Sequence, residues 1–163
     1  MRKILIINTG GTFNKVYDPL NGELIVSKTA HTVEQIANKW FCEFEVLNII
    51  GKDSLDMTNQ DRLELLATIS HSGYEYIIVI HGTDTMNMTA EYLFDGDCEK
   101  CIVFTGAMVP YSIDPVEATA NLSSAYGYIN ALEKSGIYIA MNGVMDTYEK
   151  VKKDKKLGKF IFA

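Results

Sequence analysis

The sequence has little cysteine, with three such residues in 163. Secreted domains held together by disulfides carry a dense set of cysteines, so this count argues against a disulfide scaffold and favours a reducing compartment. Cys98 and Cys101 form a CxxC pair, but no second pair lies at a spacing that would complete a zinc site. We therefore expect Cys42, Cys98 and Cys101 to be structural thiols, and we expect neither a metal nor a cofactor.

Long hydrophobic runs are also missing. No apolar stretch approaches the roughly 18 residues that a membrane-spanning helix needs. The first residues, MRKILIINTGG, have a basic start, but their apolar part is shorter than the apolar core of a signal peptide. We expect this segment to be the first β-strand, and the chain to be a cytoplasmic protein without a membrane partner.

A positive net charge is missing too. Lysine and arginine number 15 against 21 aspartates and glutamates, which gives a formal charge of −6. We therefore expect no nucleic-acid partner. The stretch from Lys150 to Ala163 is the exception, because its lysines outnumber its one acidic residue, Asp154. A basic run of this kind is typical of a solvated surface.

Five short runs rich in apolar and β-branched residues are present, at residues 3–8, 44–50, 76–80, 101–105 and 137–141. They are nearly all apolar rather than alternating, which is typical of parallel strands covered by helices on both faces. Helical patterns lie between them. The predicted helices begin at Thr32, where Gln35 would complete a capping box, and span 59–71, 86–94 and 115–134, with Thr58 and Asp114 as further caps.

This order of elements predicts one doubly wound α/β domain over residues 1–163, a three-layer Rossmann-like or flavodoxin-like fold with a mostly parallel sheet. Between the first strand and the first helix lies VYDPLNGELIV, residues 16–26. Its Asp-Pro and Asn-Gly pairs predict an N-terminal β-hairpin that forms a flap over the sheet edge.

Small and polar residues follow the predicted strands. The segments are NTGGT at 8–12, GKDSLDM at 51–57, HGTDTM at 81–86 and TGAMVP at 105–110. Because ligands of open α/β sheets bind outside the carboxyl ends of the strands, we expect these segments to line one pocket.

Three chemistries could use such a pocket. Phosphate binding is disfavoured, because TGGTFNK matches neither a P-loop nor a dinucleotide fingerprint. Metal binding would need clustered ligands, and His81 with Asp84 is one such pair. A hydroxyl nucleophile fits better, since Thr9 and Thr12 flank a glycine pair. No histidine is placed as the base of a Ser-His-Asp triad, so the base would be a lysine, a tyrosine or a carboxylate.

The four motifs NTGGTF (8–13), KDSLDM (52–57), HGTDTM (81–86) and TGAMVP (105–110) together resemble those of the bacterial-type L-asparaginases, the asparaginase/glutaminase amidohydrolase family. The resemblance covers essentially the whole chain but only the family's N-terminal domain. It implies a short form that lacks the usual C-terminal domain.

The resemblance implies roles for individual residues. Thr12 resembles the nucleophile, and Tyr17 resembles a flap tyrosine that helps to activate it. Asp84 would bind the α-ammonium group of the substrate, and Thr83 would contribute its hydroxyl and its main-chain N–H. The remaining substrate-binding positions are Gly11, Ser54 for the α-carboxylate, Leu55 and, through its carbonyl, Ala107.

The resemblance also implies a lysine beside Thr83 and Asp84. The family places it in a Val-x-Lys sequence after the last core strand, which selects Lys153 within EKVKKDKK, with Lys152 as the second choice. His81, by contrast, is expected to be structural.

Two departures from the family qualify the expected function. Leu55 stands where the family usually has glutamine, and the C-terminal domain that completes the pocket between subunits is missing. We expect an amidohydrolase that releases ammonia from a small amide, most readily L-asparagine, and that assembles as a homodimer or homotetramer. The alternative is a non-catalytic module that binds an amino acid or assembles with a partner chain.

Overall fold

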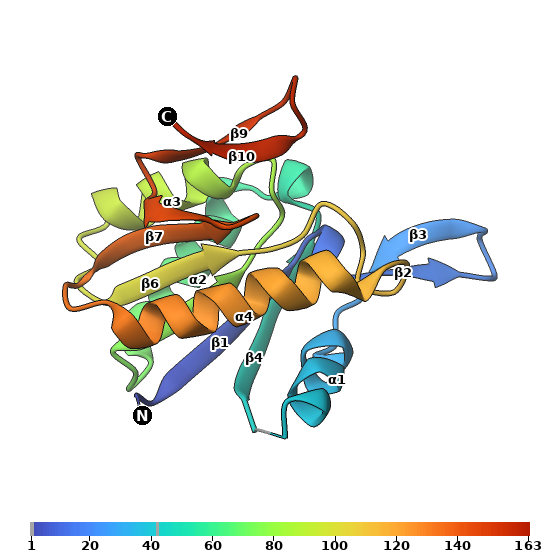
Figure 1. Ribbon diagram of the computed structural model, residues 1–163, viewed down its shortest axis with the longest axis horizontal. Helices are drawn as coiled ribbons and strands as arrows, with labels where there is room; N and C mark the ends of the chain where they lie inside the picture. The colour runs from blue at the N-terminus through green and yellow to red at the C-terminus, as the bar shows by residue number, and fades with distance from the viewer. Residues whose placement is uncertain (1, 42) are drawn as a thin grey trace.

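The computed structural model describes residues 2–41 and 43–163, so Cys42 lies outside the described residues. Figure 1 shows a central sheet with helices on both faces and two hairpins at its margins. The elements, in chain order, are β1 (Ile4–Gly10), η1 (Thr12–Asn14), β2 (Lys15–Asp18), β3 (Glu23–Val26), α1 (His31–Lys39), β4 (Glu45–Lys52), η2 (Ser54–Asp56), α2 (Asn59–His71), β5 (Tyr76–Ile80), α3 (Met86–Asp95), β6 (Cys101–Thr105), α4 (Pro115–Ala131), β7 (Gly136–Met141), β8 (Val144–Thr147), β9 (Val151–Asp154) and β10 (Lys159–Phe162).

Within the described residues the main sheet has six strands in the order β4-β1-β5-β6-β7-β8. The first five are parallel to one another, and β8 pairs with β7 in the antiparallel direction. Strand β4 lies on one side of β1 in the sheet, and β5, the next strand of this sheet along the chain, lies on the other side. The predicted doubly wound α/β fold is therefore confirmed, and the strand order reverses between β1 and β5, where such folds bind ligands.

Two hydrophobic clusters cover the two faces of the sheet. One contains side chains of α1 and α4, such as Ile36 and Leu122, and the other contains side chains of α2 and α3, such as Leu65 and Leu93. Their apolar residues are almost entirely buried, as expected for strands between helix layers. The expectation is wrong for β4, however. This strand forms the sheet edge, and Leu47 on it is 41% exposed.

The helix boundaries follow their capping residues. Thr58 and Asp61 form a capping box at the start of α2, and the side chain of Asp114 accepts a hydrogen bond from Val116 N at the start of α4. The predicted capping box at Thr32 and Gln35 is wrong. Helix α1 begins at His31, so Thr32 lies inside the first turn, where it is buried. Helix α4 ends at Ala131, three residues earlier than predicted, because the backbone adopts an extended conformation at Leu132.

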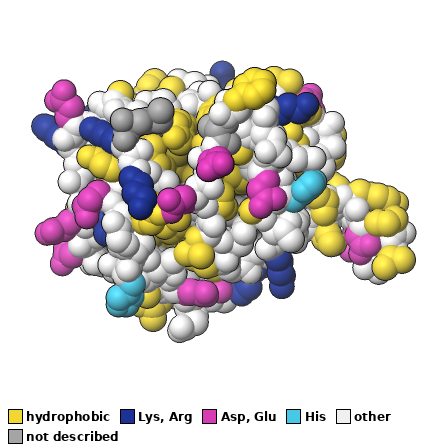
Figure 2. Space-filling model, turned by 90° about the horizontal axis from the view of Figure 1, so that it is seen from below, with side chains coloured by type: hydrophobic (Ala, Val, Ile, Leu, Met, Phe, Trp, Pro, Cys, Tyr) yellow, Lys and Arg dark blue, Asp and Glu magenta, His cyan; other side chains and the backbone are white. Residues whose placement is uncertain are grey.

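Strands β2 and β3 form the predicted flap hairpin. It stands out from the body of the molecule, and Figure 2 shows apolar side chains gathered on it. Leu20, at its turn, is 93% exposed, and Leu24 and Ile25 are also exposed.

A second hairpin, β9–β10, lies at the C-terminal end, above α3 and β7 in Figure 1. Val151 and Phe160 anchor it, because both side chains are buried in the cluster that α2 and α3 share. Among the described residues, none of the helices combines the length and the apolar character that a membrane crossing needs.

Candidate active site

Three of the predicted loops meet backbone to backbone at the carboxyl ends of the strands. Gly11 has φ 75°, and a Cβ on it would lie 2.5 Å from the backbone nitrogen of Gly82. A Cβ on Gly82 would in turn lie 2.6 Å from the Cβ of Ser54. Such approaches are possible only without side chains, so the glycines bring the loops after β1, β4 and β5 into contact.

Thr83, Asp84 and Lys153 form a hydrogen-bonded cluster at this rim. The Nζ atom of Lys153 donates to Thr83 Oγ1 at 2.8 Å and to Asp84 Oδ1 at 2.9 Å. The Lys153 side chain is 19% exposed and that of Asp84 is 34% exposed, so the ion pair is partly shielded from solvent. Lys152, the second choice, is exposed and lines another depression, beside Asn87.

Thr12 lies in the same cleft as this cluster. The cleft has a volume of about 490 Å³ and is lined by Thr12, Thr83, Asp84, Met108, Lys153, Lys155 and Gly158. The structure thus places four of the five predicted catalytic side chains around one space. Met108 and Lys155 were not among the predicted site residues, because a methionine in a loop and a lysine in a basic run carry no distinctive signal.

The fifth, Tyr17, lies elsewhere. It is on β2, 64% exposed, and outside the residues that line the cleft. Leu55 is also directed away from the cleft. It is 70% exposed and lines a groove with Leu24 and Ile25 of the flap. The side chains of Tyr17, Leu20, Leu24 and Ile25 on the flap are exposed to solvent.

Ser54 and Ala107 are both buried, and neither is among the residues that line the cleft. The hydroxyl oxygen of Ser54 is buried and has no hydrogen-bond partner within residues 2–41 and 43–163. A buried polar atom without a partner is costly, and such atoms recur where a ligand supplies the missing bond.

His81 is part of the framework beneath the cleft. It is completely buried, its Nδ1 donates to the carbonyl of Gly82 at 2.7 Å, and its Nε2 accepts from the Thr89 hydroxyl at 2.8 Å. Burial and, to a smaller extent, the nearby Arg62 charge together lower the pKa of His81 to about 4, although the hydrogen bond to Gly82 acts in the opposite direction. The imidazole is therefore neutral near pH 7.

Glu117 holds the loop after β6, a role that no sequence pattern indicated. Its carboxylate accepts hydrogen bonds from the backbone nitrogens of Met108 at 3.0 Å and Val109 at 2.9 Å, and from the side-chain amide of Asn142 at 3.1 Å. One carboxylate at the start of α4 thus joins the loop that carries Met108 to the turn after β7. A glutamate in the first turn of a helix is otherwise typical of simple dipole stabilisation.

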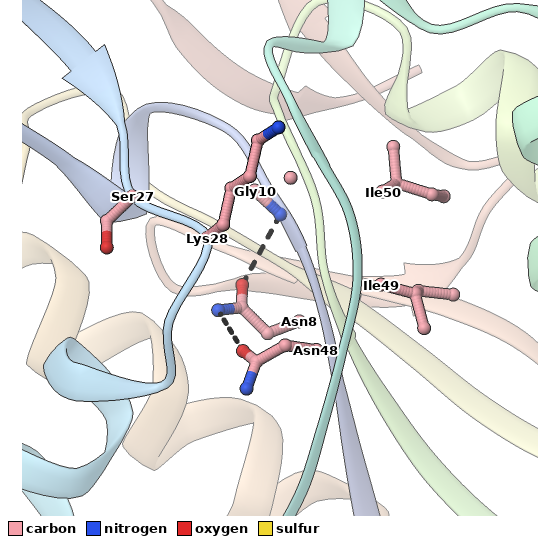
Figure 3. A pocket seen from close by; sticks show the side chains of 8 residues that line it. Asn8, Gly10, Ser27, Lys28, Asn48, Ile49 and Ile50 are labelled. Carbon is pink, nitrogen blue, oxygen red and sulfur yellow. Dashed lines mark hydrogen bonds between the residues drawn. The ribbon is translucent and has the colours of Figure 1, made fainter.

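A chain of carboxamides supports the end of β1. Asn8 donates to Asn48 and to Asn14 at 3.0 Å each, and Asn14 donates back to Asn8 at 2.7 Å. Figure 3 shows the Asn8 amide between Asn48 and the N–H of Gly10, at the floor of a second cavity of about 180 Å³. These hydrogen bonds hold the end of β1, which leads to Thr12, in place.

Metal ligands do not cluster at this rim. In the described part of the chain, no group of three or more His, Cys, Asp or Glu side chains could hold a metal ion. Cys98 and Cys101 are free thiols, and burial raises the pKa of both above the usual value of a cysteine.

Comparisons with known proteins place the chain among asparaginase-like sequences. The family model "Asparaginase, N-terminal" matches residues 3–157. A Haemophilus influenzae protein named "Probable L-asparaginase periplasmic" is 31% identical over 153 residues, which cover 85% of this chain and 42% of the relative. A glutamyl-tRNA(Gln) amidotransferase subunit of Methanococcus vannielii is 28% identical over 156 residues, which cover 90% of this chain and 35% of the relative.

Solved structures show the same fold. The thermostable L-asparaginase from Thermococcus kodakarensis superimposes with a TM-score of 0.83 at 24% identity, over 98% of this chain and 50% of that chain. The present sequence therefore spans between about a third and a half of the length of these relatives.

Proposed function

The chain belongs to the asparaginase family, whose N-terminal domain it matches, and we propose that it is an amidohydrolase that releases ammonia from a small amide, with L-asparagine as the expected substrate. The observation that carries the proposal is the ion pair between Lys153 and Asp84, 2.9 Å long, in the cleft that Thr12 also lines. A module that only binds an amino acid has no need for hydroxyls and a shielded lysine in one cleft.

In the proposed reaction the hydroxyl oxygen of Thr12 attacks the amide carbon and forms a tetrahedral oxyanion. The backbone N–H of Thr83 is the proposed donor to that oxyanion, because the N–H of Gly11 already donates to the carbonyl of Lys52 at 2.9 Å. Collapse of the intermediate breaks the C–N bond, and the leaving nitrogen takes up the proton that Thr12 gave up, so that ammonia departs. Water then hydrolyses the Thr12 ester and releases the carboxylic acid.

Lys153 has a defined part in this proposal. Because its ammonium already donates to Asp84 and Thr83, it fixes the Thr83 hydroxyl and keeps the Asp84 carboxylate beside the cleft. Asp84 Oδ1 is engaged by the lysine, which leaves the other carboxylate oxygen for the substrate ammonium group. The carbonyl of Ala107 is the proposed acceptor for the amide that is cleaved.

Ser54 is the proposed contact for the substrate carboxylate. Its buried hydroxyl lacks a partner within the described residues and can donate to an anion. The resemblance also implies a role for Tyr17, which would require the exposed flap to move towards the cleft. It implies a substrate contact for Leu55 as well, although this side chain lies on η2 and lines the groove beside the flap.

Ammonia release tests the proposal. Wild-type protein, Thr12→Ala and Thr12→Ser would be assayed with asparagine, glutamine and succinamate, the monoamide of succinic acid. We expect turnover by the wild type, a loss of about 10³-fold in Thr12→Ala and partial activity in Thr12→Ser, because serine keeps the nucleophilic oxygen. Full activity in Thr12→Ala, or no turnover of any amide by the wild type, would refute it.

A second candidate is a component of a larger assembly. This candidate is supported by the Methanococcus vannielii relative, which is named as an amidotransferase subunit. Its alignment covers 90% of this chain but only 35% of the relative, which is therefore much longer. The exposed apolar flap, with Leu20, Leu24 and Ile25, offers a surface for a partner or for a second copy. Purified protein that binds aspartate but hydrolyses no amide would favour this candidate, and light scattering would show whether the chain forms the proposed dimer or tetramer.

A further inference from the structure

The charged groups around the candidate site are mostly arranged in pairs. Lys153 lies 2.9 Å from Asp84, and two further pairs, Lys15–Asp53 at 3.0 Å and Lys52–Asp61 at 2.9 Å, flank the η2 segment that contains Ser54. Each pair cancels its own charge, so none of these lysines is available to a substrate anion without losing its present partner.

Arg62 differs from all of them. It lies on α2 and is 4% exposed, yet no carboxylate lies within ion-pair distance of it among the described residues. Its guanidinium donates only to neutral oxygens, which are Thr89 Oγ1 at 3.0 Å, Thr85 Oγ1 at 3.3 Å and the carbonyl of Met57 at 3.4 Å. Burying a charge without a counter-ion is costly, and hydrogen bonds to neutral groups offset only part of that cost.

The position of this charge connects it to the cleft. The Thr85 hydroxyl that accepts from Arg62 donates in turn to the carbonyl of Ser54 at 3.0 Å. The guanidinium is thus two hydrogen bonds behind Ser54, whose side-chain hydroxyl is buried and unpartnered within the described residues. Asp56, the nearby acidic residue of η2, is exposed, so solvent screens its charge more strongly than that of Arg62.

We propose that Arg62 determines the charge of the substrate: its buried, uncompensated cation makes the region around Ser54, which packs against Gly82 beside the cleft, electropositive, so that only amides that also carry a carboxylate bind there well. This inference rests on the proposed amidohydrolase function and adds a residue that does not contact the substrate. Arg62 is a positioning residue, because it acts through its field and through the Thr85–Ser54 hydrogen bond.

Two substrates that differ in one charge test the inference. Succinamate carries a carboxylate, and succinamide has a second neutral amide in its place. We expect the wild type to prefer succinamate in kcat/KM, and we expect Arg62→Gln to reduce this preference about tenfold, because the variant lacks one buried positive charge near the substrate carboxylate. The ratio does not depend on how much of the variant is folded, since both substrates meet the same preparation.

Two further variants sharpen the comparison. Lys52→Gln also removes one positive charge near η2, but that side chain is 42% exposed, so solvent screens its charge and the preference should change much less than in Arg62→Gln. Arg62→Lys keeps the charge and loses the forked hydrogen bonds, so it should retain more of the preference than Arg62→Gln. If Arg62→Gln lowers kcat/KM equally for both substrates, the preference is unchanged. That result would show a purely structural role for Arg62 and overturn the inference.

A binding measurement tests this inference independently of the proposed reaction. Titration calorimetry would compare succinate with succinamide in the wild type and in Arg62→Gln. A preference for succinate that Arg62→Gln weakens supports the inference even if no amide is hydrolysed, in which case the proposed reaction alone fails. Equal binding of succinate and succinamide by the wild type, or no binding of succinate, overturns the inference whatever the turnover.

Discussion

The Nζ atom of Lys153 lies 2.8 Å from the Thr83 hydroxyl oxygen, although 70 residues separate the two in the sequence. The contact depends on β9, whose side chains alternate between two faces. Val151 is buried and Lys153 follows it on the same face, whereas Lys152 between them is exposed. The register of one short strand therefore selects which of two neighbouring lysines enters the cleft.

A pair of lysine substitutions tests this selection. Lys153→Met removes the ammonium that holds the Thr83 hydroxyl and the Asp84 carboxylate in place. We therefore expect ammonia release to fall by about 10²-fold, the size of effect that misplaced groups in an active site cause. Lys152→Met removes the same charge from an exposed side chain and should change kcat by less than about twofold. Steady-state kinetics of both variants would measure these effects. A larger loss of kcat in Lys152→Met than in Lys153→Met would contradict the assignment of Lys153 to the site.

Gly11 and Gly143 provide a matched test of the loop contact at the cleft. Both have a positive φ, at 75° and 79°, so alanine should cost each about 1–2 kcal/mol of backbone strain. Only at Gly11 would the new Cβ also meet a backbone atom, at 2.5 Å, whereas nothing lies within 4 Å at Gly143. We expect Gly11→Ala to lose activity because the loops must separate, and Gly143→Ala to show a lower melting temperature with activity largely kept. Similar activity in the two variants would exclude a role for this contact.

Glu117 should be needed as a carboxylate. Both of its oxygens accept N–H bonds, so glutamine would turn one acceptor into a donor that faces Met108, Val109 or Asn142. We expect Glu117→Gln to lower the free energy of unfolding by about 1–3 kcal/mol and to raise KM, because Met108 lines the cleft. Glu133→Gln, at an exposed site just after α4, is the control and should leave both unchanged. Denaturant titrations with kinetics on the same samples would measure the two effects.

The buried His81 predicts an acid-sensitive fold. Its pKa is about 4 in the folded chain against 6.5 for an unperturbed histidine. Between these values the unfolded chain binds more protons than the folded one, so stability falls as the pH drops from about 6.5 towards 4, by up to about 3 kcal/mol. The contribution of His81 is fully present above pH 6.5. Urea titrations at several pH values should show this slope in the wild type and in His31→Gln, an exposed control, and a flatter one in His81→Gln.

Much of the fold could be predicted from the sequence because its signals are local. The strands β5 and β6 and the helix α2 match their predicted ranges, since apolar runs and the Thr58 cap depend on neighbouring residues. The edge position of β4 could not be predicted, because an apolar run does not say which strands will cover it. The start of α1 was missed because Thr32 fits a capping pattern and is instead buried within the first turn.

The candidate site also contains residues that the sequence predicted and residues that it did not. Thr12, Thr83 and Asp84 stand out because each lies in a polar segment directly after a strand. The β9–β10 hairpin was missed, since six lysines hide the alternation that buries Val151 and Phe160. Arg62 and Glu117 were missed as well, because their importance comes from partners that are distant in the sequence: Thr89 is 27 residues from Arg62, and Asn142 is 25 residues from Glu117.

We expect the β9–β10 hairpin to be the last wall of the cleft to form during synthesis. The loops that carry Thr12, Thr83 and Met108 precede Lys153 in the chain and leave the ribosome before it. We expect Lys153 to reach Asp84 only when Val151 and Phe160 dock onto the sheet. Until then a nascent chain carries an Asp84 carboxylate without its cation, and its cleft lacks one wall. We therefore expect the proposed chemistry to begin only once the β9–β10 hairpin has docked.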